Sequence, residues 1–119
     1  MTSIRFSKIL KKLLSDIKDW HYPAEAARKS YADMLKNVYG INIESERFYL
    51  YFTTDLTFML CKTEKDEAKL IIRHGEIFEC SPEDFEVASD VERLFLLVDS
   101  EFYNSSPTIE DAVDEFLSE

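Results

Sequence analysis

Residues 47–60, RFYLYFTTDLTFML, decide the fold predicted for this chain. Apolar side chains alternate with other residues on both sides of the polar pair Thr54 and Asp55. A period of two is typical of a β-strand with one buried face, and a short polar turn between two such runs predicts an antiparallel hairpin. The alternating residues are Phe48, Leu50 and Phe52 before the turn and Leu56, Phe58 and Leu60 after it.

Two further strands are predicted directly after this hairpin. The polar segment TEKDE at 63–67 leads into AKLIIRHGEIFEC at 68–80, where we expect a turn at His74 and Gly75 because glycine accepts a positive φ. The four strands together predict an antiparallel meander. Its opposite face is only partly polar, and we expect more helix or a second subunit to cover it. The apolar side chains assigned to that face are Tyr49, Tyr51, Met59 and Ile71.

Two helices are predicted before the strands. In residues 2–20, apolar side chains recur at spacings of four and three, which is the pattern of an amphipathic helix. A second helix at 22–40 opens near Pro23, which suits a first helical position, and stops at Gly40, which can adopt the left-handed conformation. The apolar residues of the first helix are Phe6, Leu10, Leu13, Ile17 and Trp20.

The end of the chain also predicts helices. Ser81 and Pro82 stand in capping positions for residues 81–104. The segment RLFLLV at 93–98 fits either a helix or a buried strand, and the cap and the charged flanks favour a helix. Residues 106–119, SPTIEDAVDEFLSE, combine five carboxylates with a helical apolar stripe that we expect to dock on the core. The stripe consists of Ile109, Ala112, Val113, Phe116 and Leu117.

These elements predict one α+β domain over residues 1–119, with two N-terminal helices, a four-stranded antiparallel meander, and two or three C-terminal helices packed on the sheet. A chain of 119 residues with 45% apolar residues is large enough to bury a core without disulfides. No apolar run approaches the roughly 18 residues that cross a bilayer. We therefore expect no membrane span and a cytoplasmic protein.

The charge of the chain is unevenly distributed. Residues 1–40 hold eight basic and four acidic side chains, and residues 41–80 hold five and eight. Residues 81–119 hold twelve acids and a single base, Arg93, so that the last third carries most of the net charge of −10. Such a surface repels nucleic acid, and direct binding to it is not expected.

The sequence contains no catalytic signature. Its two glycines both stand at predicted turns, so a glycine-rich phosphate-binding loop is not expected. The histidines, His21 and His74, and the cysteines, Cys61 and Cys80, lack the spacing of a metal site. We therefore expect no catalytic residue, no cofactor and no metal, and a protein that is not an enzyme.

The acids near the C-terminus are the candidate binding residues. On a helix, Glu110 would lie beside Asp114 and Asp111 beside Glu115, and these like-charged pairs repel each other. A surface of this kind attracts a basic partner and accelerates its association. The alternative is a solvated face that is neutralised internally by Lys8, Lys11 and Lys12 of the first helix. The predicted partner-binding residues are Asp99, Glu101, Tyr103, Glu110, Asp111, Asp114 and Glu115.

Three functions are compatible with this sequence. The first is a small inhibitor that covers the positive surface of a basic protein such as a nuclease, as immunity proteins and nucleic-acid mimics of similar size and charge do. The second is a homodimeric adaptor or secretion-type chaperone that binds a client through the aromatic sheet face. The third is a small enzyme with a site assembled from distant residues. A monomer and a homodimer are both compatible with the sequence.

Overall fold

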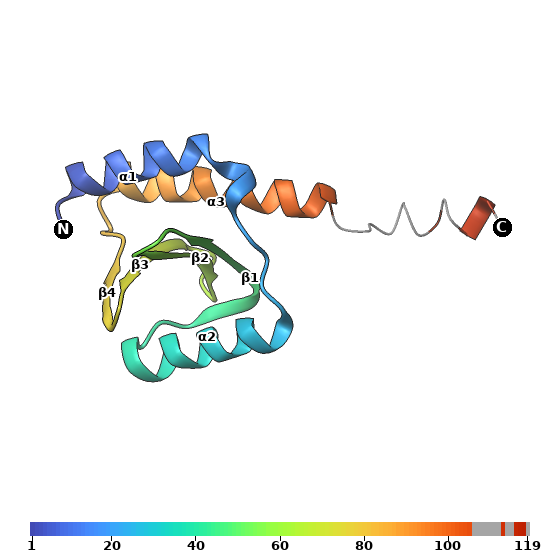
Figure 1. The fold of residues 1–119 in the computed structure, drawn as a ribbon, viewed down its shortest axis with the longest axis horizontal. Helices are drawn as coiled ribbons and strands as arrows, with labels where there is room; N and C mark the ends of the chain where they lie inside the picture. Colours follow the sequence, from blue (N-terminus) through green and yellow to red (C-terminus); the bar gives the residue numbers. More distant parts are fainter. Residues whose placement is uncertain (106–112, 114–115, 119) are drawn as a thin grey trace.

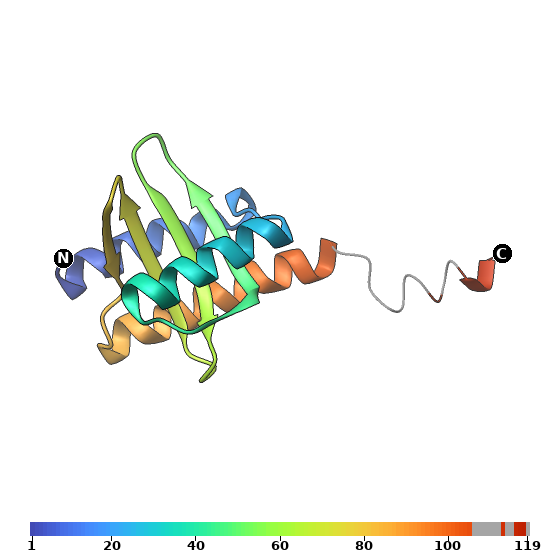
Figure 2. The ribbon, with the colours of Figure 1, turned by 90° about the horizontal axis from the view of Figure 1, so that it is seen from below.

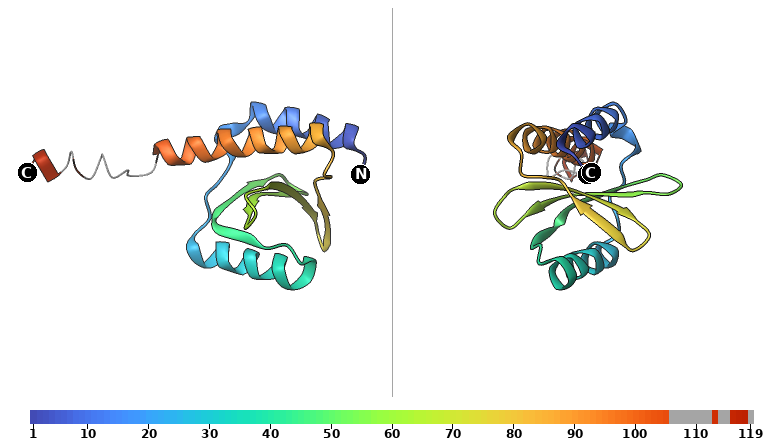
Figure 3. Two further views of the ribbon diagram at one scale, coloured as in Figure 1. Left: turned by 180° about the vertical axis from the view of Figure 1, so that it is seen from behind. Right: turned by 90° about the vertical axis from the view of Figure 1, so that its left-hand side faces the viewer.

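The computed structural model describes residues 1–105, 113 and 116–118, and its elements form three layers. Helices α1 and α3 lie side by side on one face of a four-stranded sheet, and α2 covers the other face (Figures 1 and 3). The predicted α+β class and the order of its elements are confirmed. The elements are α1 (Ser3–Ser15), the 3-10 turn η1 (Ile17–Asp19), α2 (Glu25–Tyr39), β1 (Ile43–Phe52), β2 (Thr57–Thr63), β3 (Ala68–His74), β4 (Ile77–Cys80) and α3 (Phe85–Ser105).

The sheet is the predicted antiparallel meander, with strand order β1-β2-β3-β4. The turn between β3 and β4 differs by one residue from the prediction, because His74 still pairs with Ile77 and the turn consists of Gly75 and Glu76. Gly75 has a φ of 61°, which is the conformation expected of glycine at this position. The strands cross beneath the two helices of the upper layer, as Figure 2 shows from below.

The strand register divides the core into two parts. Tyr49 pairs with Leu60 and therefore faces α1 and α3, whereas Leu50 pairs with Met59 and faces α2. The predicted grouping of Tyr49, Tyr51, Met59 and Ile71 on one face is therefore wrong. From Phe48 to Phe52 the hairpin pairs each odd-numbered residue of β1 with an even-numbered residue of β2, so Tyr49 and Tyr51 lie on the opposite face from Met59 and its β3 partner Ile71.

The upper layer is held by the apolar faces of its two helices. Helix α1 buries Phe6, Leu10 and Leu13, and the Thr2 hydroxyl caps its first turn by accepting a hydrogen bond from Arg5 N at 3.2 Å. Residues 93–98 are helical, as the capping pattern favoured. The buried residues of α3 recur at helical spacing: Val87, Val91, Leu94, Phe95 and Val98.

The start of α3 differs from the prediction. Asp84 accepts a hydrogen bond from Glu86 N at 3.1 Å, while the buried Ser81 hydroxyl accepts one from Leu70 N at 3.1 Å. Ser81 therefore continues the pairing along β3 instead of capping the helix. A serine before a proline can cap a helix or can accept a hydrogen bond from a neighbouring strand. The position of β3, which the sequence does not reveal, decides that Ser81 has the second role.

Helix α2 ends as predicted at Gly40, whose φ is 68° and whose N–H donates to the carbonyl oxygens of Leu35 and Lys36. Only part of its apolar side is buried. Leu35 is fully buried, but Val38 is 66% exposed. Among the described residues, no helix has both the length and the apolar character needed to span a membrane.

Replacing Gly40 with alanine is expected to lower the free energy of unfolding by about 1 kcal/mol. A Cβ at this position would meet no atom within 4 Å, so the loss would come from the left-handed backbone and not from a clash. Urea denaturation measures it. Gly40→Asn should lose less, because asparagine tolerates this conformation better, and equal stability of all three proteins would contradict the assignment of the cap.

Candidate functional site

Several acids of the last third are bound within the fold. Glu92 of α3 accepts hydrogen bonds from Lys62 Nζ and from Ala68 N, each at 2.7 Å. Lys62 is only 8% exposed and its ammonium also donates to the carbonyl oxygen of Asp66 at 3.2 Å. Glu92 therefore balances a buried positive charge and fixes α3 against the ends of β2 and β3.

Asp99 is also held by the core. Its carboxylate accepts a short hydrogen bond from the hydroxyl of Tyr49, a buried residue of β1. Burial and the neighbouring carboxylate both raise the pKa of Tyr49 well above its usual value. Asp99 was predicted to contact a partner, but in the fold it positions the C-terminal half of α3 on the sheet.

The stability of the protein at alkaline pH should depend on the hydrogen bond between Tyr49 and Asp99. Because the pKa of Tyr49 is raised in the folded state, its contribution to stability is present below the ordinary tyrosine pKa of about 10 and declines as the pH rises toward the folded value. Burial likewise raises the pKa of the Cys61 thiol to about 12. We expect Tyr49→Phe to flatten the loss of stability above pH 10, measured by urea denaturation across a pH series.

Tyr39→Phe is the matched control for this experiment, because Tyr39 is an exposed tyrosine at the end of α2. It should leave the pH dependence unchanged. If Tyr49→Phe and Tyr39→Phe gave the same profile as the unmodified chain, the contact with Asp99 would not contribute to stability.

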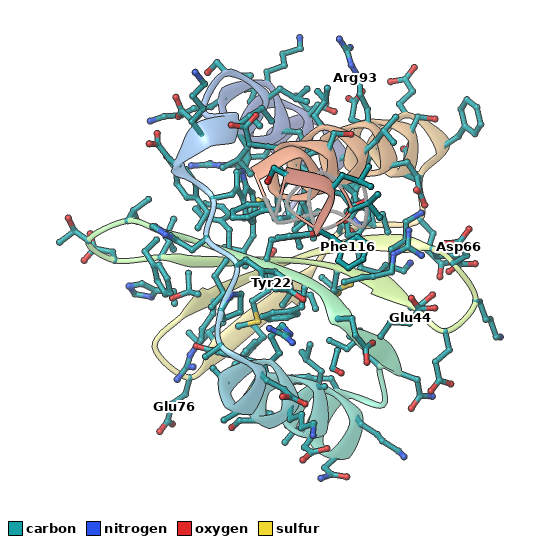
Figure 4. All side chains as sticks on the ribbon, turned by 90° about the vertical axis from the view of Figure 1, so that its right-hand side faces the viewer. Tyr22, Glu44, Asp66, Glu76, Arg93 and Phe116 are labelled. Atoms are coloured by element: carbon teal, nitrogen blue, oxygen red, sulfur yellow. The ribbon has the colours of Figure 1, made fainter. Side chains whose placement is uncertain are left out.

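Of the other acids in this region, Glu83 and Asp84 precede α3, and Glu86, Asp90 and Glu101 lie within it. At the N-terminal end, Glu83 forms an ion pair with Lys69 at 3.8 Å and Asp84 caps the helix. At the other end, Glu101 is exposed. The middle of the outer face instead carries Arg93, which points away from the sheet (Figure 4), and the exposed Leu96. The described part of α3 is therefore not one continuous anionic face.

The structure describes only part of the predicted binding set. Asp99 and Glu101 lie two residues apart near the end of α3, and Tyr103 also lies in this helix. Glu110, Asp111, Asp114 and Glu115 lie outside the described residues. In the described positions beyond α3 the predicted docking of the apolar stripe is wrong, because Val113, Phe116 and Leu117 are 46%, 74% and 73% exposed.

Helix α1 lies directly beside α3, but it makes this contact with apolar side chains (Figure 3). Lys8, Lys11 and Lys12 are exposed, and within the described part of the chain none of them forms an ion pair with α3. The ion-pair partners in this region are strand cations: Lys62 of β2 pairs with Glu92 of α3, and Lys69 of β3 pairs with Glu83, which precedes the helix.

A groove of about 700 Å³ lies between α1 and the β1–β2 hairpin, which sequence reasoning missed. Its apolar lining includes Ile9 and Leu13 from the helix and Leu56 and Phe58 from the hairpin. The α1 side also carries three cations, Arg5, Lys8 and Lys12. These cations share one helical face, a signal visible in the sequence, but the approach of the hairpin depends on tertiary structure.

A cluster of positive and negative side chains surrounds Phe95, at the ends of β1 and β2 that lie away from this groove. Arg47 Cζ and Lys62 Nζ lie 5.2 and 5.3 Å from the centre of its ring, and Arg47 also binds Asp66 at 3.0 Å. The Arg47 guanidinium holds the pKa of Asp66 below its usual range. Asp66 and Glu44, both partners of Arg47, project on the same side of the molecule (Figure 4). The charged side chains of this cluster therefore form ion pairs with one another.

No group of three or more histidine, cysteine, aspartate or glutamate side chains in the described ranges could hold a metal ion. No family model, no curated protein and no solved structure matches this chain significantly. The functional interpretation therefore depends on the surfaces of the molecule itself.

Proposed function

We propose that this protein is a small protein-binding inhibitor, which captures a basic protein such as a nuclease with its acidic C-terminal end. The observation that carries the proposal is the course of α3, which runs past the edge of the sheet (Figure 1), together with the exposure of the apolar residues that follow it in sequence, Val113, Phe116 and Leu117. Five carboxylates stand among these residues in the sequence between 106 and 119, without a base.

Charge and apolar area have separate roles in this proposal. The carboxylates attract a positively charged surface over a distance of about 10 Å at moderate salt and raise the rate of encounter. Exposed aromatic and aliphatic side chains such as Phe116 then provide the contacts that slow dissociation. Exposure of three large apolar side chains in one acidic segment supports binding to protein over solvation alone.

The internal contacts of α3 support a surface beyond its C-terminal end. Glu92 and Asp99 are both committed to groups of the sheet, Lys62 and Tyr49. We therefore assign partner binding to the five carboxylates of residues 106–119. In this proposal Asp99, bound to Tyr49, orients the helix that leads to these residues.

Affinity capture with two matched variants tests the proposal. Glu110→Gln, Asp111→Asn, Asp114→Asn and Glu115→Gln together remove four acids from the C-terminal segment, and this set is called the tail variant. The control variant removes four exposed acids elsewhere, by Asp33→Asn, Asp55→Asn, Glu64→Gln and Glu76→Gln. The two variants have the same net charge.

We expect a basic protein to be retained from the native host by the unmodified chain and by the control variant at low salt, and to be retained less at moderate salt. The tail variant should retain it at least about tenfold less at low salt, because electrostatic steering depends on the local surface. Equal retention by the tail and control variants would refute the assignment of the surface.

A further inference from the structure

We propose that the groove between α1 and the β1–β2 hairpin binds the C-terminal segment, residues 109–119, of a second copy of this chain. The groove combines an apolar lining with exposed cations, and the segment combines apolar residues with carboxylates. Amphipathic segments commonly bind with their apolar side in a hydrophobic groove, and complementary charges fix the partner and the register. The contact is reciprocal, so that two copies form a twofold dimer.

The groove presents its charge at regular spacing. Arg5, Lys8 and Lys12 lie on one face of α1, and side chains three or four residues apart on a helix are about 5–6 Å from each other. Within the described residues these cations have no acidic partner. Ile4, at the same groove, is 73% exposed, which leaves apolar surface for an incoming side chain.

The C-terminal segment matches this pattern. Phe116 and Leu117 are exposed in the single chain, at 74% and 73%. Asp111 and Glu115 are four residues apart, as Lys8 and Lys12 are, so a helical segment could oppose both pairs together. Arg93 is the last basic residue of the sequence, so no positive side chain in the segment would repel the cations of α1.

The geometry favours the C-terminal segment of a second copy, and not that of the same chain, as the occupant of the groove. The groove lies on the side of α1 that faces the β1–β2 turn, whereas α3 lies on the other side of α1 (Figure 3). Helix α3 leads its C-terminal end away from the end of the molecule where α1 begins (Figure 1). A chain leaving α3 would have to pass around α1 to reach its own groove, and a neighbouring copy offers a direct approach.

Sedimentation analysis of the full chain over a range of concentrations tests this inference without any other protein. We expect a monomer–dimer equilibrium at low salt. Lys8→Glu with Lys12→Glu should raise the dissociation constant of the dimer at least about tenfold, since each dimer loses four ion pairs and gains repulsion. Lys11→Glu with Lys18→Glu is the matched control, because these exposed lysines do not line the groove.

A charge exchange makes the test specific to the two surfaces. Asp111→Lys with Glu115→Lys should weaken the dimer as the groove variant does, and the chain carrying all four reversals should recover most of the original affinity. A strictly monomeric chain at low salt, equal effects of the groove and control pairs, or failure of the exchange to restore the dimer would each overturn the inference.

The two proposals fail separately. Sedimentation measures self-association in the absence of a basic partner, so a monomeric chain would leave the capture result unaffected. Because the docked tail is covered in the dimer, the capture test also uses the chain with Lys8→Glu and Lys12→Glu; failure of this dissociated chain to retain a basic protein at low salt would contradict the proposed function and leave the docking of the tail unaffected.

Discussion

Replacing Glu92 with alanine is expected to lower the free energy of unfolding by about 2 kcal/mol, because Lys62 is buried although the Glu92 side chain is 44% exposed. The substitution removes the carboxylate that binds Lys62 at 2.7 Å and the acceptor for Ala68 N. Lys62 is 8% exposed, and its nearest remaining carboxylate, that of Asp66, lies 3.6 Å from its ammonium and is largely solvated. The loss arises because a buried charge and a buried N–H lose their best partners together.

A double substitution separates this cause from simple loss of packing. Lys62→Met keeps an unbranched side chain but removes the charge, so the chain with Lys62→Met and Glu92→Gln should be clearly more stable than Glu92→Ala alone. Glutamine still offers an oxygen to Ala68 N. Urea denaturation midpoints measure all three chains, and a loss below about 1 kcal/mol for Glu92→Ala would show that the pair is solvated in the folded protein.

Replacing Phe116 with alanine is expected to raise the dissociation rate of the captured basic partner about thirtyfold, which corresponds to about 2 kcal/mol of binding free energy. Phe116 is 74% exposed in the free protein, so it is available as an anchor for another surface. Its removal leaves the carboxylates in place, and the association rate should change little. Surface plasmon resonance separates the two rates.

Phe85 supplies the control for this substitution. It is 84% exposed at the start of α3, far along the helix from the C-terminal segment. Phe85→Ala should leave both rates unchanged, and neither substitution should change the stability of the fold by more than about 0.5 kcal/mol. Equal dissociation rates for Phe116→Ala and the unmodified chain would remove Phe116 from the proposed surface.

Local patterns in the sequence predicted the elements of this fold well. The period of two in residues 47–60 and the glycine at position 40 each act through neighbouring residues, and both predictions are confirmed. The assignment of sheet faces failed because it depends on which residues pair across the β1–β2 turn. Tyr49 and Met59 are both apolar and both odd-numbered, yet the register places them on opposite faces.

The candidate site was less predictable, because charge in a sequence does not reveal its partners. In the sequence, Glu92 and Asp99 belong to an acidic segment. In the fold, they bind Lys62 and Tyr49, which lie 30 and 50 positions earlier in the β-strands. The groove was missed for a related reason. The face of α1 with Lys8 and Lys12 is visible in the sequence, but the apolar wall opposite comes from a hairpin some 40 residues later.

The salt dependence of the association rate between this protein and its captured basic partner tests the central claim most directly. We predict that the rate of the unmodified chain falls steeply as salt increases, and that the control variant behaves in the same way. The tail variant should associate slowly at low salt and show a much flatter dependence, because its local field is largely removed. Identical rates and identical salt dependence for the tail variant and the unmodified chain would contradict the proposal that the acidic C-terminal end binds the partner.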